Sequence, residues 1–202
     1  VSGRYTYDYD KKYFAEFDFG YNGSERFYKA KRFGFFPSFG AAWTVSKEAF
    51  FKPISHAITN LKLRATYGLV GNDAVGAPTD RFFYLSNVDL NDATRSATFG
   101  TDYTYTRNGV SISRYSNQDI TWETAAKTNL GLEMSIIDRV NIELDLYREH
   151  RKHILMARSF IPLTTGLSST PQANVGQAKG KGIDLSVDFQ QSFSSGLWLQ
   201  LR

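Results

Sequence analysis

The feature that most constrains this chain is an alternation of apolar and polar side chains that recurs along most of its length. Between 61 and 70, the odd positions are apolar, whereas the even ones include Lys62, Arg64 and Thr66. Successive side chains of a strand point to opposite faces, so this period of two predicts strands with one apolar and one hydrated side. The same pattern predicts eight strands, at 4–7, 13–22, 37–45, 61–70, 122–136, 140–146, 183–189 and 197–202.

Charge is confined to one side of the five clearest strands. None of their apolar-side positions is charged, whereas the opposite side carries Glu16, Asp18, Lys62, Arg64, Glu123, Lys127, Glu133, Glu143, Asp145, Asp184 and Asp188. A Lys or Arg that faces lipid near the bilayer midplane costs roughly 2–4 kcal/mol, and a lumen-facing one costs little. A membrane barrel obeys this constraint, and so does a soluble sandwich with one dry face.

The connections between the predicted strands differ in length at the two ends. Alternate assignment gives one rim the segments 8–12, 46–60, 137–139 and 190–196, and the other rim the segments 23–35, 71–121 and 149–178. Short periplasmic turns and long external loops are typical of transmembrane barrels, whereas a structureless connection as long as 71–121 is unusual in a soluble sandwich. The sequence therefore predicts an all-β fold, an antiparallel transmembrane β-barrel.

Composition agrees with this fold class. Aromatic residues make up 15% of the chain, there is no cysteine, and a net charge of +4 is too evenly spread to indicate a nucleic-acid partner. Aromatic side chains near the predicted strand ends suit the interfacial girdles of a barrel, although ordinary strand propensity explains them equally. These residues are Tyr13, Tyr21, Trp43, Tyr67, Trp122 and Phe189.

No catalytic or metal-binding motif is visible, so we predict neither an enzyme nor a cofactor. His150 and His153 are the only histidines close in sequence, and on a strand two positions three apart face opposite sides.

Ligand-binding candidates are Tyr103, Tyr105 and Arg107 in the 71–121 loop, where aromatic faces and polar groups can meet sugars or peptides. The alternative is a loop that packs on its neighbours. A basic cluster of Arg26, Lys29, Lys31 and Arg32 is interpreted as a solvated loop, with contact to lipopolysaccharide phosphates or to acidic groups of a substrate as the alternative.

Several phrases of the sequence, in order and over nearly the whole chain, resemble the SusC/RagA group of TonB-linked outer-membrane transporters. They are NGSERF at 22–27, RFGFFPS at 32–38, AW at 42–43, LKLRATYG at 61–68, GN at 71–72, ITWET at 120–124, NLGLE at 129–133, YRE at 147–149, NVG at 174–176 and KGIDL at 181–185.

The resemblance implies a 22-stranded barrel in the bacterial outer membrane, with a plug in its lumen. Residues 1–202 are then expected to be part of the barrel domain, with the plug and the C-terminal strands outside this sequence. It also implies TonB-dependent import of an oligosaccharide or peptide. The implied partners are a SusD-like surface lipoprotein, the TonB complex through the absent N-terminal region, and outer-membrane lipids.

Two alternatives stay open at this point. One is a complete eight-stranded membrane barrel that acts as an adhesin or anchor, since eight strands suffice for closure. The other is a soluble carbohydrate-binding β-sandwich.

Overall fold

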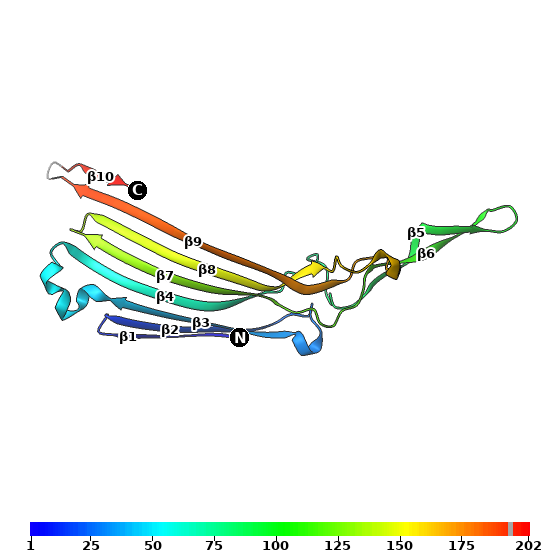
Figure 1. Ribbon diagram of the computed structural model, residues 1–202, viewed down its shortest axis with the longest axis horizontal. Coiled ribbons are helices and arrows are strands. Elements are labelled where there is room, and N and C mark those ends of the chain that lie inside the picture. The colour runs from blue at the N-terminus through cyan, green and yellow to red at the C-terminus, as the bar shows by residue number, and fades with distance from the viewer. Residues whose placement is uncertain (194–195) are drawn as a thin grey trace.

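A computed structural model of the protein describes residues 1–193 and 196–202. Its main element is one antiparallel sheet of eight strands in the order β1-β2-β3-β4-β7-β8-β9-β10 (Figure 1). The strands are β1 (Ser2–Tyr9), β2 (Tyr13–Gly23), β3 (Phe33–Thr44), β4 (Ile58–Asn72), β7 (Glu123–Ile136), β8 (Val140–Ala157), β9 (Gln172–Ser192) and β10 (Trp198–Leu201). A separate hairpin contains β5 (Asn87–Phe99) and β6 (Tyr105–Arg114). Short 3-10 turns complete the described structure, at η1 (Lys29–Lys31), η2 (Val45–Lys47), η3 (Ala49–Ile54) and η4 (Leu163–Thr165).

The register of the strands joins their apolar sides into one face. Directly opposed residues of an antiparallel pair lie on the same side of the sheet. One such row runs across seven strands, through Tyr7, Ala15, Ala41, Ala65, Leu130, Leu146 and Ile183. The predicted alternation is therefore confirmed, and it holds across the sheet as well as along each strand.

The apolar face has no second layer of protein over it. Leu63, Leu130 and Ile183 are 42%, 54% and 68% exposed. The accessible surface is 14302 Å², whereas a compact folded protein of this mass has about 9,600 Å². The soluble-sandwich alternative is therefore wrong, because a sandwich would bury this face between two sheets.

The sheet is open in the described part of the chain. Its edges are β1 and β10, which lie on opposite sides of the sheet (Figure 1). The alternative of a complete, closed eight-stranded barrel is therefore wrong. None of the described helical segments is long and apolar enough to cross a membrane.

Two groups of aromatic rings lie on the apolar face near the ends of the strands. Tyr13 stacks on Tyr9 and Trp43 beside the short turns, and Tyr21 stacks on Phe33 beside the long connections. Eight residue steps separate Tyr13 from Tyr21, which is about 27 Å of extended chain and about 21 Å of height for a strand tilted by about 40°. This separation is close to the height of an apolar band about 25 Å tall between two aromatic girdles.

Trp122 differs from the predicted girdle residues. It lies just before β7, outside the strand, and it is buried at 8% exposure. The prediction that it begins a strand is wrong, because an alternating pattern at a strand end does not show where the ladder stops.

The long connections contain more strand than the sequence predicts. β8 and β9 extend as far as Ala157 and Gln172, so the connection between them covers only 158–171. The segment 71–121 is not structureless, since β5 and β6 form a hairpin that projects beyond the end of the sheet (Figure 1). Nearly every residue of β5 is exposed, so neither side needs apolar residues and the alternation that reveals other strands is absent.

Candidate functional site

The face opposite the apolar one carries a network of paired charges centred on Arg64. Its Nε lies 3.0 Å from Glu133 Oε1, and its Nη2 lies 3.0 Å from Asp145 Oδ2. Lys62 Nζ is 3.9 Å from the same glutamate, and Asn129 Nδ2 donates to Asp145 Oδ1 at 3.0 Å. Three neighbouring strands, β4, β7 and β8, supply these groups. The network is neutral and half-exposed, which suits a hydrated wall.

A glycine makes room for this network. Gly131 lies between Arg64 and Asp145 in the register of β4, β7 and β8. A Cβ atom at Gly131 would lie 2.6 Å from Arg64 Nε and 2.9 Å from Asp145 Oδ1. The guanidinium can therefore lie flat on the sheet only because position 131 lacks a side chain.

A second charged group lies on the same face at the β1 edge. Arg4 pairs with Glu16, and its Nε is 3.2 Å from Asp18 Oδ1. A hollow of about 450 Å³ extends from these carboxylates to Lys62 and Arg64. It offers hydrogen-bond donors and acceptors to a polar molecule, and both carboxylates form ion pairs with Arg4.

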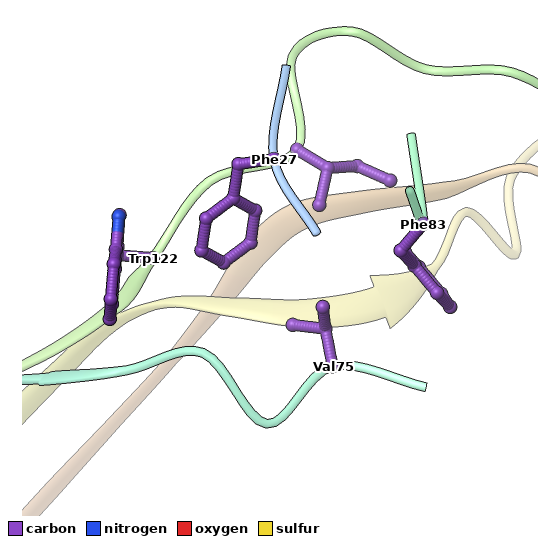
Figure 2. Close-up of a cluster of buried hydrophobic side chains, with 5 residues drawn as sticks. Phe27, Val75, Phe83 and Trp122 are labelled. Atoms are coloured by element: carbon purple, nitrogen blue, oxygen red, sulfur yellow. The ribbon is translucent and has the colours of Figure 1, made fainter. Parts of the chain in front are cut away.

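The long connections form a small hydrophobic core of their own beyond the ends of the strands. Phe27, Val75, Phe83, Ile120 and Trp122 are buried there together (Figure 2). The rings of Phe27 and Trp122 are 5.3 Å apart, and the indole Nε1 of Trp122 donates to the carbonyl of Arg32 at 3.3 Å. The sequence analysis did not predict this core. Its signal in the sequence is a set of large apolar residues, without alternation, in segments expected to be exposed loops.

Polar contacts tie the same connections together. Arg26 Nη1 donates to the carbonyls of Asp73 and Val75 at 3.2 and 3.0 Å. Arg81 donates to both carboxylate oxygens of Glu25 at 2.5 and 2.8 Å, and this bond lowers the pKa of Glu25 and raises the pKa of Arg81.

The prediction of a solvated basic cluster is therefore wrong for two of its members. Arg26 binds backbone carbonyls as described, and Lys31 Nζ contacts Asp119 Oδ1 at 3.0 Å. These long-range contacts are invisible to composition, because their partners lie 47 to 88 residues away in the chain.

The predicted ligand-binding residues lie on the projecting hairpin. Tyr103 is in its turn with φ of 54°, and it is 73% exposed. Arg107 and Tyr105 both belong to β6, and the guanidinium lies 4.9 Å from the centre of the tyrosine ring. The structure thus brings Tyr105 and Arg107 together and places Tyr103 at the tip. Their role in ligand binding stays a prediction.

The two close histidines do not converge on a metal site. His150 lies within β8, and His153 sits at an irregularity in the β8–β9 pairing with φ of 58°. Within 1–193 and 196–202, no group of three or more His, Cys, Asp or Glu side chains is placed to hold a metal ion.

Comparison with known proteins places this sheet in a family. Residues 1–201 match the family model described as "TonB dependent receptor-like, beta-barrel". The chain belongs to this family of outer-membrane β-barrels. TonB-dependent receptor P3 of Formosa agariphila is 33% identical over 93% of this chain, and TonB-dependent receptor SusC of Bacteroides thetaiotaomicron is 28% identical over 92% of it. The chain spans 18% of the length of each of these relatives.

Two solved outer-membrane proteins resemble this chain in structure. The RagAB peptide importer in its "closed-closed" state matches 96% of this chain with a TM-score of 0.75 and 25% identity, and the match covers 20% of that chain. The siderophore receptor PirA from Pseudomonas aeruginosa matches 98% of this chain and 32% of its own with a TM-score of 0.55, and at 14% identity it supports the fold alone. The SusC/RagA resemblance and the outer-membrane location are confirmed, and the family agrees with the prediction that this chain is not an enzyme.

Proposed function

We propose that this chain forms part of the wall of a SusC/RagA-type transporter that imports a bulky nutrient, an oligosaccharide or a peptide, across the outer membrane. One observation carries the proposal. The whole sheet, together with its long connections, matches both SusC in sequence and a RagAB peptide importer in structure.

The two faces of the sheet support this function. The apolar face suits lipid, and the opposite face holds the paired charges of Arg64, Glu133 and Asp145 toward an enclosed, hydrated interior. Because these charges neutralise one another, the wall offers hydrogen bonds to a passing polar solute without one strong fixed charge that would trap it. Plug movement driven by TonB belongs to segments outside these residues and is part of the same proposal.

The external side of the wall supports capture of a solute. The loop core of Phe27, Val75, Phe83, Ile120 and Trp122 holds the connections as one packed body at the rim. From this body the β5–β6 hairpin projects outward with Tyr103 exposed at its tip. We propose that its aromatic side chains stack on sugar rings or peptide groups, beside a SusD-like lipoprotein that caps the barrel.

The proposal is tested by uptake in the native bacterium. We expect deletion of the gene to abolish growth on one class of polymer, either glycans or peptides, and deletion of tonB to have the same effect. Uptake that persists without TonB would contradict the proposed mechanism.

The hairpin is tested separately with the full-length protein. The double substitution Tyr103→Ala and Tyr105→Ala should weaken binding of the imported solute by about 1–3 kcal/mol, at about 0.5–1.5 kcal/mol for each aromatic contact. Thr98→Ala, on β5 of the same hairpin, is the matched control. Unchanged binding by the double variant would remove the hairpin from the proposed site and leave transport itself intact.

A further inference from the structure

A tyrosine lies along the inward wall, next to the charge network of Arg64. Tyr147 on β8 has an inward position, because the register places it in one row with Thr66, Asn129 and Gly182. A Cβ atom at Gly182 would overlap the phenol oxygen, Cζ and Cε1 of Tyr147. The tyrosine side chain therefore lies across Gly182 and along the sheet, instead of projecting into the lumen.

The glycine is what permits this orientation. Directly opposed residues of an antiparallel pair have Cβ atoms about 4.5–5.5 Å apart, so a side chain at position 182 would occupy the space of the ring. With glycine there, one side of the ring rests on β9 and the other side is open, and Tyr147 is 43% exposed. The wall thus presents an aromatic surface whose orientation is already fixed before a ligand binds, which lowers the entropic cost of binding.

A hollow of about 500 Å³ lies over this ring. Its lining includes Thr66 of β4, Lys127 of β7, Tyr147 of β8 and Asp184 of β9. Four neighbouring strands therefore build it (Figure 1). The volume falls within the range of small-molecule sites, which is about 300–1,000 Å³.

Two charged groups flank the ring along the strands. The row of Lys127 is two residue steps from that of Tyr147 toward the external end, and the row of Asp184 is two steps toward the periplasmic end. Two steps correspond to about 7 Å of strand. Both side chains are exposed, and neither forms an ion pair within residues 1–193 and 196–202. The hollow therefore offers one uncommitted donor group and one uncommitted acceptor group.

The other two carboxylates of the lining are already paired. Asp145 contacts Arg64, and Glu149 contacts Arg151. The positive charge of Lys127 and the negative charge of Asp184 balance each other, so the hollow carries no net charge toward a ligand.

The height of the ring places it near the external mouth of the lumen. Tyr147 is seven residue steps from Val140, the first residue of β8 after the short turn. Seven steps are about 24 Å of strand and about 18 Å of height for a strand tilted by about 40°. In an apolar band about 25 Å tall, the ring lies in the external half, where a solute that enters from outside reaches the wall.

We propose that this hollow is a sugar-binding subsite and that the imported nutrient is a neutral oligosaccharide. The inference rests on the proposed function and selects one of its two substrate classes. A pyranose ring has an apolar C–H face that stacks on an aromatic side chain, and its hydroxyl groups both donate and accept hydrogen bonds. Tyr147 stacks on that face, the Asp184 carboxylate accepts from one hydroxyl, and the Lys127 ammonium donates to another. Because the hollow has no net charge, it favours an uncharged ligand over an acidic one.

Isothermal titration calorimetry of the purified full-length protein tests the substrate class. The probes are neutral oligosaccharides prepared from glucans, mannans, galactans and fructans, and a tryptic digest of casein. We expect one of the oligosaccharides to bind and the casein peptides not to bind. Binding of casein peptides without binding of any oligosaccharide would overturn the inference, and it would leave the proposed function intact with peptide as the nutrient.

Substitutions in the hollow test the site with the oligosaccharide that binds. Tyr147→Ala should weaken its binding about five-fold, which corresponds to about 1 kcal/mol for one aromatic contact, whereas Tyr147→Phe keeps the ring and should bind as the wild type does. Tyr67→Ala is the matched control, because Tyr67 is 47% exposed on the opposite, outward face of the neighbouring strand β4. The control should leave the affinity unchanged.

A second variant keeps the test decisive where Tyr147→Ala fails to fold, which heat-modifiable mobility on a gel reports. The double substitution Lys127→Gln and Asp184→Asn leaves the net charge and the ring unchanged, and it should weaken binding about five-fold or more through two weaker hydrogen bonds. Wild-type affinity in this variant or in folded Tyr147→Ala would overturn the proposal. Calorimetry uses no TonB, so uptake that persists without TonB would contradict the transport mechanism and not the sugar subsite.

Discussion

An arginine at Ala65 should destabilise the folded protein far more than an arginine at Thr66. These two residues are neighbours on β4, both are exposed, and both have short side chains, so neither substitution removes a large apolar contact. Their side chains point to opposite faces of the sheet. Ala65 lies in the apolar row between Ala41 and Leu130, whereas Thr66 lies between Gly40 and Asn129 on the charged face.

The depth of Ala65 sets the size of the effect. It lies four residue steps above Leu61, about 14 Å of strand and about 10 Å of height for a strand tilted by about 40°. This is near the middle of an apolar band about 25 Å tall, where an arginine costs about 2–4 kcal/mol. A cost of 3 kcal/mol lowers the folding equilibrium constant roughly 160-fold. Arginine at Thr66 meets water and should cost less than about 1 kcal/mol.

Reversible folding of the full-length protein into lipid vesicles, titrated with guanidinium chloride, gives both free energies. Equal costs at the two positions would refute the assignment of the faces, and a larger cost at Thr66 would reverse it.

Three further predictions concern the loops and the inward face. Trp122→Ala should destabilise the loop core by about 3–5 kcal/mol, because a large buried side chain is lost, and limited proteolysis should then cut the external connections faster while the strands stay protected. Gly131→Val should cost about 1–3 kcal/mol in the guanidinium titration and displace Arg64, since a side chain there overlaps the guanidinium; an unchanged midpoint would contradict the close approach. Because Arg81 lowers the pKa of Glu25 below its ordinary value of 4.5, their pair stabilises the loops above that pH and is lost as the pH falls through the lowered pKa. Proteolysis of the loops should therefore accelerate at acid pH in the wild type, and Glu25→Gln should remove that component of the pH dependence.

The strands of the wall could be predicted because two solvents act on them. A face toward lipid excludes charge, and a face toward water accepts it, so rows such as Ala65, Leu130 and Ile183 leave a periodic trace in the sequence. The hairpin of β5 and β6 could not be predicted in this way, because water surrounds both of its sides and no alternation is required. The ends of β8 and β9 were missed for a related reason, since the outward positions there become basic and no longer look like a membrane strand.

Some residues of the candidate site could likewise be predicted from the sequence, whereas others were found only in the fold. Tyr103, Tyr105 and Arg107 could be chosen as exposed aromatic and polar residues, but their place on a projecting hairpin came only from the fold. The loop core that includes Trp122 was not predicted, because its members come from segments far apart in the sequence.

The sequence alone therefore determined the fold class, the family and the two faces of the wall, because alternation is a local consequence of strand geometry between lipid and water. Tertiary structure alone decided which residues lie opposite one another. That register brings Arg148 beside Lys181 and Arg64 beside Asp145, and it assembles the loop core at the outer rim. The physical reason is that the register of two strands depends on the turn that joins them and on how their faces pack together, which the alternation within each strand does not record.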